Sequence, residues 1–150
     1  MKLAEALQIK KNLDIKITNI KQRLENNARV QEGLEPAENP TALFKELEET
    51  IISLEKYTSR INITNSQTKV DGKTLTELLS RREALKEKIA AYDKFIVSGS
   101  VLTDRYSNTE ILVRPTLPIN EIQKRRDLIA KELREIDYKI QETNFTTDLI

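Results

Sequence analysis

The chain contains no cysteine and no histidine among its 150 residues. These two absences exclude disulfides, thiol nucleophiles, imidazole bases and Cys/His zinc sites. Only an ion that prefers oxygen ligands, such as magnesium or calcium, remains as a metal partner. No stretch of about 18 apolar residues occurs, so we expect no transmembrane helix.

The chain also has no large excess of charge of one sign, because 25 basic residues are balanced by 24 acidic ones to give a net charge of +1. This balance gives no bulk electrostatic case for binding nucleic acid or an anionic membrane. The opening stretch, MKLAEALQIKK, carries charges every few positions and lacks the apolar core of a signal peptide. We therefore expect a cytoplasmic protein.

Glycine and proline are scarce, and they fall only between segments with helical periodicity. Because both residues disfavour helix interiors, their joint absence from four long segments predicts four helices. Gly99 is expected just past the end of the third helix. The three glycines and four prolines are Gly33, Gly72, Gly99, Pro36, Pro40, Pro115 and Pro118. The predicted helices cover residues 2–31, 40–65, 75–98 and 121–143.

Short signals mark the expected helix starts. Asn39 is a favourable N-cap, and Pro40 after it fits the first helical position. Thr74 and Glu77 form a T-x-x-E capping box. Asn120 is the expected cap of the fourth helix.

Each predicted helix carries one stripe of apolar residues at near-heptad spacing, which is typical of helices that bury one face against a partner. In the second helix the stripe includes Phe44 and Ile51. The connections at 32–39 and 66–73 are short enough for antiparallel hairpins, and the second contains the turn dipeptide Asp71-Gly72. The chain is thus predicted to be all-α, a single domain over residues 1–150 that forms an antiparallel four-helix bundle or coiled coil. A longer loop at 100–119 includes a segment with β character at about 108–117.

The sequence also predicts an internal duplication, with hairpin repeats at 1–66 and 73–150. Residues near the start of the first helix match residues 72 positions later, and the word INITNSQT matches IQETNFTT 79 positions later. The polar residues that interrupt the apolar stripes repeat together with the leucines, and this favours duplication over chance similarity. The matched pairs include Leu3/Leu75, Glu5/Glu77, Lys10/Arg82, Ile61/Ile140, Thr64/Thr143 and Asn65/Asn144.

The repeated polar residues are candidate site residues with a structural interpretation. Lys10 and Arg82 are expected to lie near the helix ends marked by Asn65 and Asn144, where a basic side chain can satisfy free carbonyls. They are predicted to anchor the hairpins or to contact a partner.

The long loop contains the other two candidate residues, Arg105 and Tyr106, between glycine and proline signals. Long ordered loops often carry function, and the alternative is that this pair fixes the loop on the bundle or on a neighbouring subunit. No phosphate-binding glycine loop and no nucleophile motif occurs in the sequence. We expect neither catalytic residues, nor a metal site, nor a cofactor, and we predict a protein that is not an enzyme.

Several isoleucines fall outside the apolar stripes, namely Ile15, Ile52 and Ile63. They either widen the core or form a surface for another subunit, and we expect a homo-oligomer. The leading interpretation is a self-assembling or protein-interaction module, and an enzyme or nucleotide-binding protein that uses the 100–119 loop is a further alternative.

Six segments spread over nearly the whole chain resemble the septicolysin-like family of small bacterial proteins. The segments are KLAEAL, NNARVQEGLEPAENP, RINITN, LTELLSRREALKEKI, DRYSNTEI and IQETNFTTDL. The resemblance implies an α-helical, oligomeric bacterial protein, and it offers no catalytic motif to transfer. Its label implies a membrane-active cytolysin or toxin as the alternative function.

Overall fold

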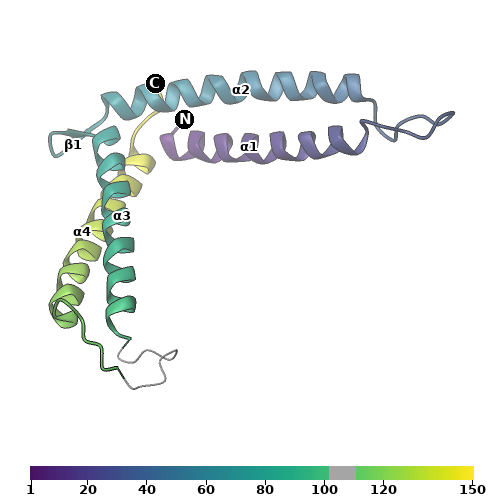
Figure 1. The fold of residues 1–150 in the computed structure, drawn as a ribbon. Helices are drawn as coiled ribbons and strands as arrows, with labels where there is room; N and C mark the ends of the chain where they lie inside the picture. The colour runs from purple at the N-terminus through teal and green to yellow at the C-terminus, as the bar shows by residue number, and fades with distance from the viewer. Residues whose placement is uncertain (102–110) are drawn as a thin grey trace. The chain divides into compact units, whose positions relative to one another are not determined.

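A computed structural model describes residues 1–101 and 111–150 of the chain. Four helices make up most of the structure, and Figure 1 shows α1 beside α2 and α3 beside α4. The predicted all-α architecture of two antiparallel hairpins is confirmed. The helices are α1 (Leu3–Asn26), α2 (Pro40–Gln67), α3 (Leu75–Gly99) and α4 (Ile119–Thr146), and the strands are β1 (Lys69–Val70) and β2 (Lys73–Thr74).

The chain forms two compact units that differ in one respect from the predicted repeats. The first unit contains residues 1–69 and also residues 143–150, and the second contains residues 70–142. The last residues of α4 and the segment after it therefore belong with α1 and α2. This assignment follows from backbone hydrogen bonds that Met1 and Leu3 make with this segment.

The core of the first unit is a single stripe between α1 and α2. Phe44 and Ile51, which were predicted to lie in this stripe, are 54% and 44% exposed, and their neighbours Leu43 and Thr50 are buried instead. Burying Thr50 is tolerated because its hydroxyl donates a hydrogen bond of 2.6 Å to the Glu46 carbonyl. One residue corresponds to about 100° of rotation on a helix, so this correction turns an apolar pair outward. The buried residues of α1 and α2 are Leu3, Ala6, Ile17, Ile20, Leu43, Thr50, Ile61 and Thr64.

The connection between α1 and α2 is attached to the end of α1 by polar groups. Asn27, which is buried, donates to the Arg23 carbonyl at 2.8 Å and accepts the Glu38 backbone N–H at 2.9 Å. The Arg23 guanidinium also pairs with the carboxylates of Glu38 and Glu46. These bonds explain why α1 ends at Asn26, five residues before the predicted end at residue 31.

The second unit holds its two helices together with apolar residues and ion pairs. Arg126 Nε lies 2.9 Å from Asp93 Oδ1, and Arg81 Nη2 lies 2.8 Å from Glu132 Oε1, so both pairs join α3 to α4. The buried apolar residues of this unit are Leu75, Leu78, Leu85, Ile122, Ile136 and Ile140.

Two of the predicted helix starts are confirmed and the third is wrong. Asn39 Oδ1 accepts the Thr41 N–H at 3.0 Å, and the Thr74 hydroxyl accepts the Glu77 N–H at 3.2 Å. The start of α4 lies at Ile119, because the Pro118 carbonyl accepts the first backbone bonds. The predicted cap Asn120 therefore lies inside the helix.

Of the two predictions made from glycine positions, the Asp71-Gly72 turn is confirmed and the place of Gly99 is wrong. Asp71 and Gly72 form the turn between β1 and β2 with φ values of 51° and 80°, as expected of a two-residue hairpin with left-handed residues. Gly99 is the last residue of α3 and not a residue beyond it. In the described part of the 100–119 loop, residues 100–101 and 111–118, only Leu112 forms a β-bridge.

The helix ends of the two hairpins correspond at the same two offsets as the matched sequence segments. α3 begins 72 positions after α1 (75 − 3), and α4 ends 79 positions after α2 (146 − 67). At the two ends, the Thr68 N–H donates to the Thr64 carbonyl and the Thr147 N–H donates to the Thr143 carbonyl, both at 2.9 Å. The two matched segments, INITNSQT and IQETNFTT, therefore form equivalent helix ends in the two hairpins.

The pairing next to these helix ends is also repeated. Lys2, just before α1, forms an antiparallel β-bridge with Asp148, just after α4. Shifted by 72 and 79 positions, these residues correspond to Thr74 in β2 and Lys69 in β1. The small β1–β2 sheet is thus the covalently connected counterpart of the Lys2–Asp148 bridge.

The duplication predicts that equivalent core leucines contribute similarly to stability. Leu3→Ala and Leu75→Ala each remove a fully buried side chain, so each is expected to lower the free energy of unfolding by about 2–5 kcal/mol. Leu128→Ala, at an exposed position of α4, is the control and should change it by less than ~0.5 kcal/mol. Denaturant unfolding followed by circular dichroism measures all three, and values for Leu3→Ala or Leu75→Ala close to the control would contradict the assignment.

Candidate functional site

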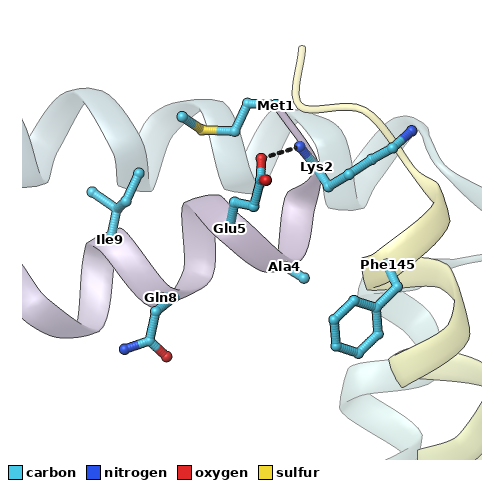
Figure 2. Close-up of a pocket in the computed structure, with 7 residues that line it drawn as sticks. All are labelled: Met1, Lys2, Ala4, Glu5, Gln8, Ile9 and Phe145. Carbon is cyan, nitrogen blue, oxygen red and sulfur yellow. Dashed lines mark hydrogen bonds between the residues drawn. The ribbon is translucent and has the colours of Figure 1, made fainter.

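A groove of about 770 Å³ runs along the start of α1 in the first unit (Figure 2). Two of its polar residues already have partners, since Glu5 accepts the Lys2 backbone N–H at 2.9 Å and Gln8 donates to Asn12 at 3.0 Å. The Phe145 ring is 70% exposed. The groove therefore offers mainly apolar surface with satisfied polar edges. Its lining residues are Met1, Lys2, Ala4, Glu5, Gln8, Ile9 and Phe145.

The segment after α4, residues 147–150, pairs with the residues at the start of α1 and is called the strap below. The Leu3 N–H donates to the Thr147 carbonyl and the Leu149 N–H donates to the Met1 carbonyl, both at 2.9 Å. Leu149 itself is buried. Backbone bonds on both sides of Lys2 therefore fix the strap to the start of α1.

The strap is also bonded to α2. The Ile150 N–H donates to the Thr64 hydroxyl at 3.1 Å, and the Thr64 hydroxyl donates to the Arg60 carbonyl at 2.8 Å. Arg60 Nε donates to the Ile150 carbonyl at 2.7 Å. Because Thr64 is fully buried, its hydroxyl needs both partners, and the strap supplies one of them.

Lys2 provides the charged contact of the strap. Its ammonium lies 3.0 Å from the Asp148 carboxylate and donates to the Thr146 carbonyl at 3.0 Å. The hydrogen bond from Lys2, and then its charge, lower the pKa of Asp148 below the ordinary value. Lys2 thus satisfies a carbonyl at the end of α4, which was the role expected of Arg82.

A second groove, of about 490 Å³, lies on α2 in the same unit. Exposed Ile51 and the acidic side chain of Glu55 are among the residues that line it. Phe44 and Glu48 lie one to two turns earlier on the same helix, and both are exposed. Neither carboxylate has an ion-pair partner within residues 1–101 and 111–150. This face of α2 is therefore apolar along its centre and acidic at its border. The lining residues of the groove are Ile51, Leu54, Glu55, Thr58, Ser59 and Asn62.

The second unit contains a charged hollow of about 360 Å³ beside the β1–β2 turn. Lys139 pairs with Asp71, and Arg81 pairs with Glu132. The hydrogen bond between Lys139 and Asp71 raises the pKa of the lysine and lowers that of the aspartate. Because these opposite charges neutralise one another, the hollow is best described as a set of structural ion pairs.

The predicted site residues are not brought together. Lys10 pairs with Asp14 one turn along α1 at 3.0 Å. Arg82 lies 3.0 Å from its neighbour Glu83 and 3.9 Å from Asp137 on α4. Lys10 lies seven residues, about 10 Å, from the start of α1, so a carboxylate on its own helix is nearer than a distant helix end.

The remaining predicted residues lie at helix ends or outside the described part. Asn65 and Asn144 are both half-buried in the last turn of their helices, at equivalent positions. Arg105 and Tyr106 fall outside the described residues. The expected contacts of Asn65, Asn144, Arg105 and Tyr106 therefore stay predictions.

Sequence reasoning missed Lys2, Thr64 and the strap as a connected group. The available signal was the repetition of Thr64 as Thr143. A threonine that recurs at equivalent helix ends indicates that its hydroxyl makes a hydrogen bond there. The partner of its hydroxyl, the Ile150 N–H, is 86 positions away, and no local pattern indicates such a contact.

The described residues contain neither a metal-binding cluster nor a helix that could span a membrane. Within residues 1–101 and 111–150, no group of three or more acidic side chains is placed to hold a metal ion. No helix in this part of the chain is long and apolar enough to cross a membrane.

The Thr64 hydroxyl is predicted to hold the strap. Thr64→Val removes the acceptor of the Ile150 N–H, so amide hydrogen exchange at Ile150 and Leu149 should become faster and the unfolding free energy should fall by about 1–2 kcal/mol. Thr50→Val is the matched control, because Thr50 is also buried and donates to a carbonyl four residues back but has no contact with the strap. Equal exchange in the two variants would exclude this role.

The Lys2–Asp148 pair predicts a dependence on pH. Since the pKa of Asp148 is lower in the folded state, the pair stabilises the strap above the ordinary aspartate pKa of about 4 and this contribution is lost as pH falls through the folded value. Protection of the Leu149 amide, corrected for intrinsic exchange rates, should drop on acidification. In Asp148→Asn the protection should already be lower at neutral pH and should change less with acid. An equal pH response of both proteins would contradict the prediction.

Comparison with known proteins places the chain in a family. It is similar to a solved crystal structure of a functionally unknown conserved protein from Corynebacterium diphtheriae, with 40% identity and a TM-score of 0.94 over 100% of this chain and 99% of that one. A comparison with curated proteins gives no match. The family of unknown function DUF6847 matches residues 10–149, so the chain belongs to that family.

Proposed function

We propose that this protein is a cytoplasmic, non-enzymatic interaction module that self-associates through the exposed face of α2. The observation that carries the proposal is the outward position of Phe44 and Ile51, two large apolar side chains seven residues apart on one helix face. Large apolar side chains that line one face of a helix are typical of surfaces that bind another helix. The expected occupant is the same face of a second copy.

The charges on this face are compatible with an antiparallel pairing of two copies. If the two-fold axis passes near residue 53, Glu48 lies across from Thr58 and Phe44 lies across from Asn62. Ile51 then lies across from Glu55, where the aliphatic part of the glutamate can cover the apolar side chain. In this register each free carboxylate faces a hydroxyl or an apolar group and not another carboxylate, so like charges do not oppose pairing.

Other exposed apolar residues are compatible with additional contacts. Ile15, Ile52 and Ile63, which were predicted to lie off the apolar stripes, are all exposed. They lie on faces of α1 and α2 away from the hairpin seam, so the seam does not require them. The membrane-active alternative rests only on the resemblance to septicolysin-like proteins, and no feature of the two grooves adds to it.

Self-association is tested by the size of the protein in solution. Light scattering across a concentration series should give a mass above 17.3 kDa for the wild type. Ile51→Asp places a third carboxylate on the face and should shift the equilibrium towards monomer by roughly tenfold or more, because burying an unpaired charge is costly. Tyr138→Asp is the matched control, since Tyr138 is an exposed apolar residue of α4.

The outcomes of this experiment are distinct. A wild type that stays monomeric at high concentration would exclude self-association. If Tyr138→Asp dissociates the assembly and Ile51→Asp does not, another surface carries it. Circular dichroism checks that both variants remain helical, which is expected because both positions are exposed.

A further inference from the structure

A small pocket of about 290 Å³ lies in the second unit, between the last third of α3 and the beginning of α4. Its volume is at the lower end of the range for small-molecule sites, roughly 300–1,000 Å³. Two aromatic side chains form one wall, and the only charged residue among those lining it is an arginine. The lining residues are Ala91, Tyr92, Phe95, Leu117, Ile122 and Arg125.

Close packing around the pocket indicates that it is preformed. A Cβ atom at Gly99 would lie 2.6 Å from the Ile119 Cδ1 atom, so the end of α3 lies tightly against the start of α4. On the other side, Arg126 Nε is 2.9 Å from Asp93 Oδ1 and joins the same two helices. Ile122 is buried between them. The pocket walls therefore belong to the packed hairpin and need little ordering when a ligand binds.

The two neighbouring arginines of α4 have different environments. Arg126 pairs with Asp93 and with Asp127. No carboxylate within residues 1–101 and 111–150 lies within 4.0 Å of the Arg125 guanidinium, and this includes Glu121, one turn earlier on the same helix. An arginine without a partner, next to an aromatic wall, is a suitable recognition group for a carboxylate, which its planar fork can bind with two hydrogen bonds.

We propose that this pocket binds a small apolar carboxylate. The carboxylate lies on Arg125, and the aromatic or aliphatic body of the ligand packs against Tyr92, Phe95 and Ile122. The charge selects acids over neutral molecules and amines, while the pocket volume limits the apolar part to about one ring with a short chain. This site lies in the second unit, so it is independent of the proposed pairing through α2.

The test compares two probes of nearly the same shape, 3-phenylpropionate and the neutral 3-phenylpropan-1-ol. Titration of the full ¹⁵N-labelled chain, followed by amide chemical shifts, should show both probes shifting Ala91, Tyr92 and Phe95. The acid should bind roughly tenfold more tightly, as expected of hydrogen bonds to a charged group. Added salt should weaken binding of the acid more than binding of the alcohol.

Three variants assign the contributions of individual residues. Arg125→Gln should weaken binding of the acid roughly tenfold and leave binding of the alcohol unchanged, because only the charged contact is lost. Lys124→Gln is the matched control, since it removes an adjacent positive charge that does not line the pocket, and it should change neither affinity. Phe95→Ala should weaken both probes.

Each contrary result would overturn the proposal. Equal affinities of the acid and the alcohol in the wild type would exclude recognition of the carboxylate by Arg125. Equal losses of affinity for the acid in Arg125→Gln and Lys124→Gln would show that general electrostatic attraction, and not a specific contact with Arg125, accounts for the binding. Shifts that map away from the pocket, or no shifts at millimolar probe, would exclude the site. Arg125 is exposed, so its variant is expected to fold, and a thermal melt checks this.

Discussion

Each helix of this protein has one apolar stripe, and two helices can bury only the stripe that they share. This constraint determines most of the structure. Leu3 and Leu75 at the start of each hairpin are fully buried. Phe44 and Ile51, in contrast, stay exposed, although each directly follows a buried residue of α2. The exposed faces are a consequence of hairpin geometry, and they are the surfaces on which a partner can act.

A hairpin core of this kind needs a defined end, and the structure ends both hairpins in the same way. At Thr68 and Thr147, a backbone N–H closes the last helical turn on a buried threonine four residues earlier. After the first hairpin, the chain turns through Asp71-Gly72 and pairs with itself. After the second hairpin, the strap pairs with the residues before α1. The two hairpins thus use one type of closure twice, once within a tight turn and once between distant segments.

The sequence predicted the features that depend on neighbouring residues. Asn39, Thr74 and the Asp71-Gly72 turn act within a few positions, so their patterns are sufficient. The end of α1 was placed too late because Asn27 is fixed by Glu38 from beyond the helix. The stripe on α2 was shifted by one residue because Thr50 has an internal partner for its hydroxyl, which makes a polar residue acceptable in the core.

Among the candidate site residues, sequence reasoning located equivalent positions but not their contacts. Lys10 and Arg82 do repeat, yet each pairs with a nearby carboxylate, and Lys2 reaches the end of α4 instead. Contacts between residues separated by more than 80 positions depend on how the hairpins close, which periodicity does not encode. The same holds for the apolar pocket beside Arg125, whose walls come from two helices and a loop.

The central claim is that the two hairpins are copies that end by the same closure. Native-state amide hydrogen exchange at the equivalent amides of Thr68 and Thr147 tests this claim most directly. The account predicts that both amides are protected and that their protection factors agree within about tenfold, because each donates to a buried threonine carbonyl at 2.9 Å. Free exchange at Thr147 beside strong protection at Thr68 would contradict it.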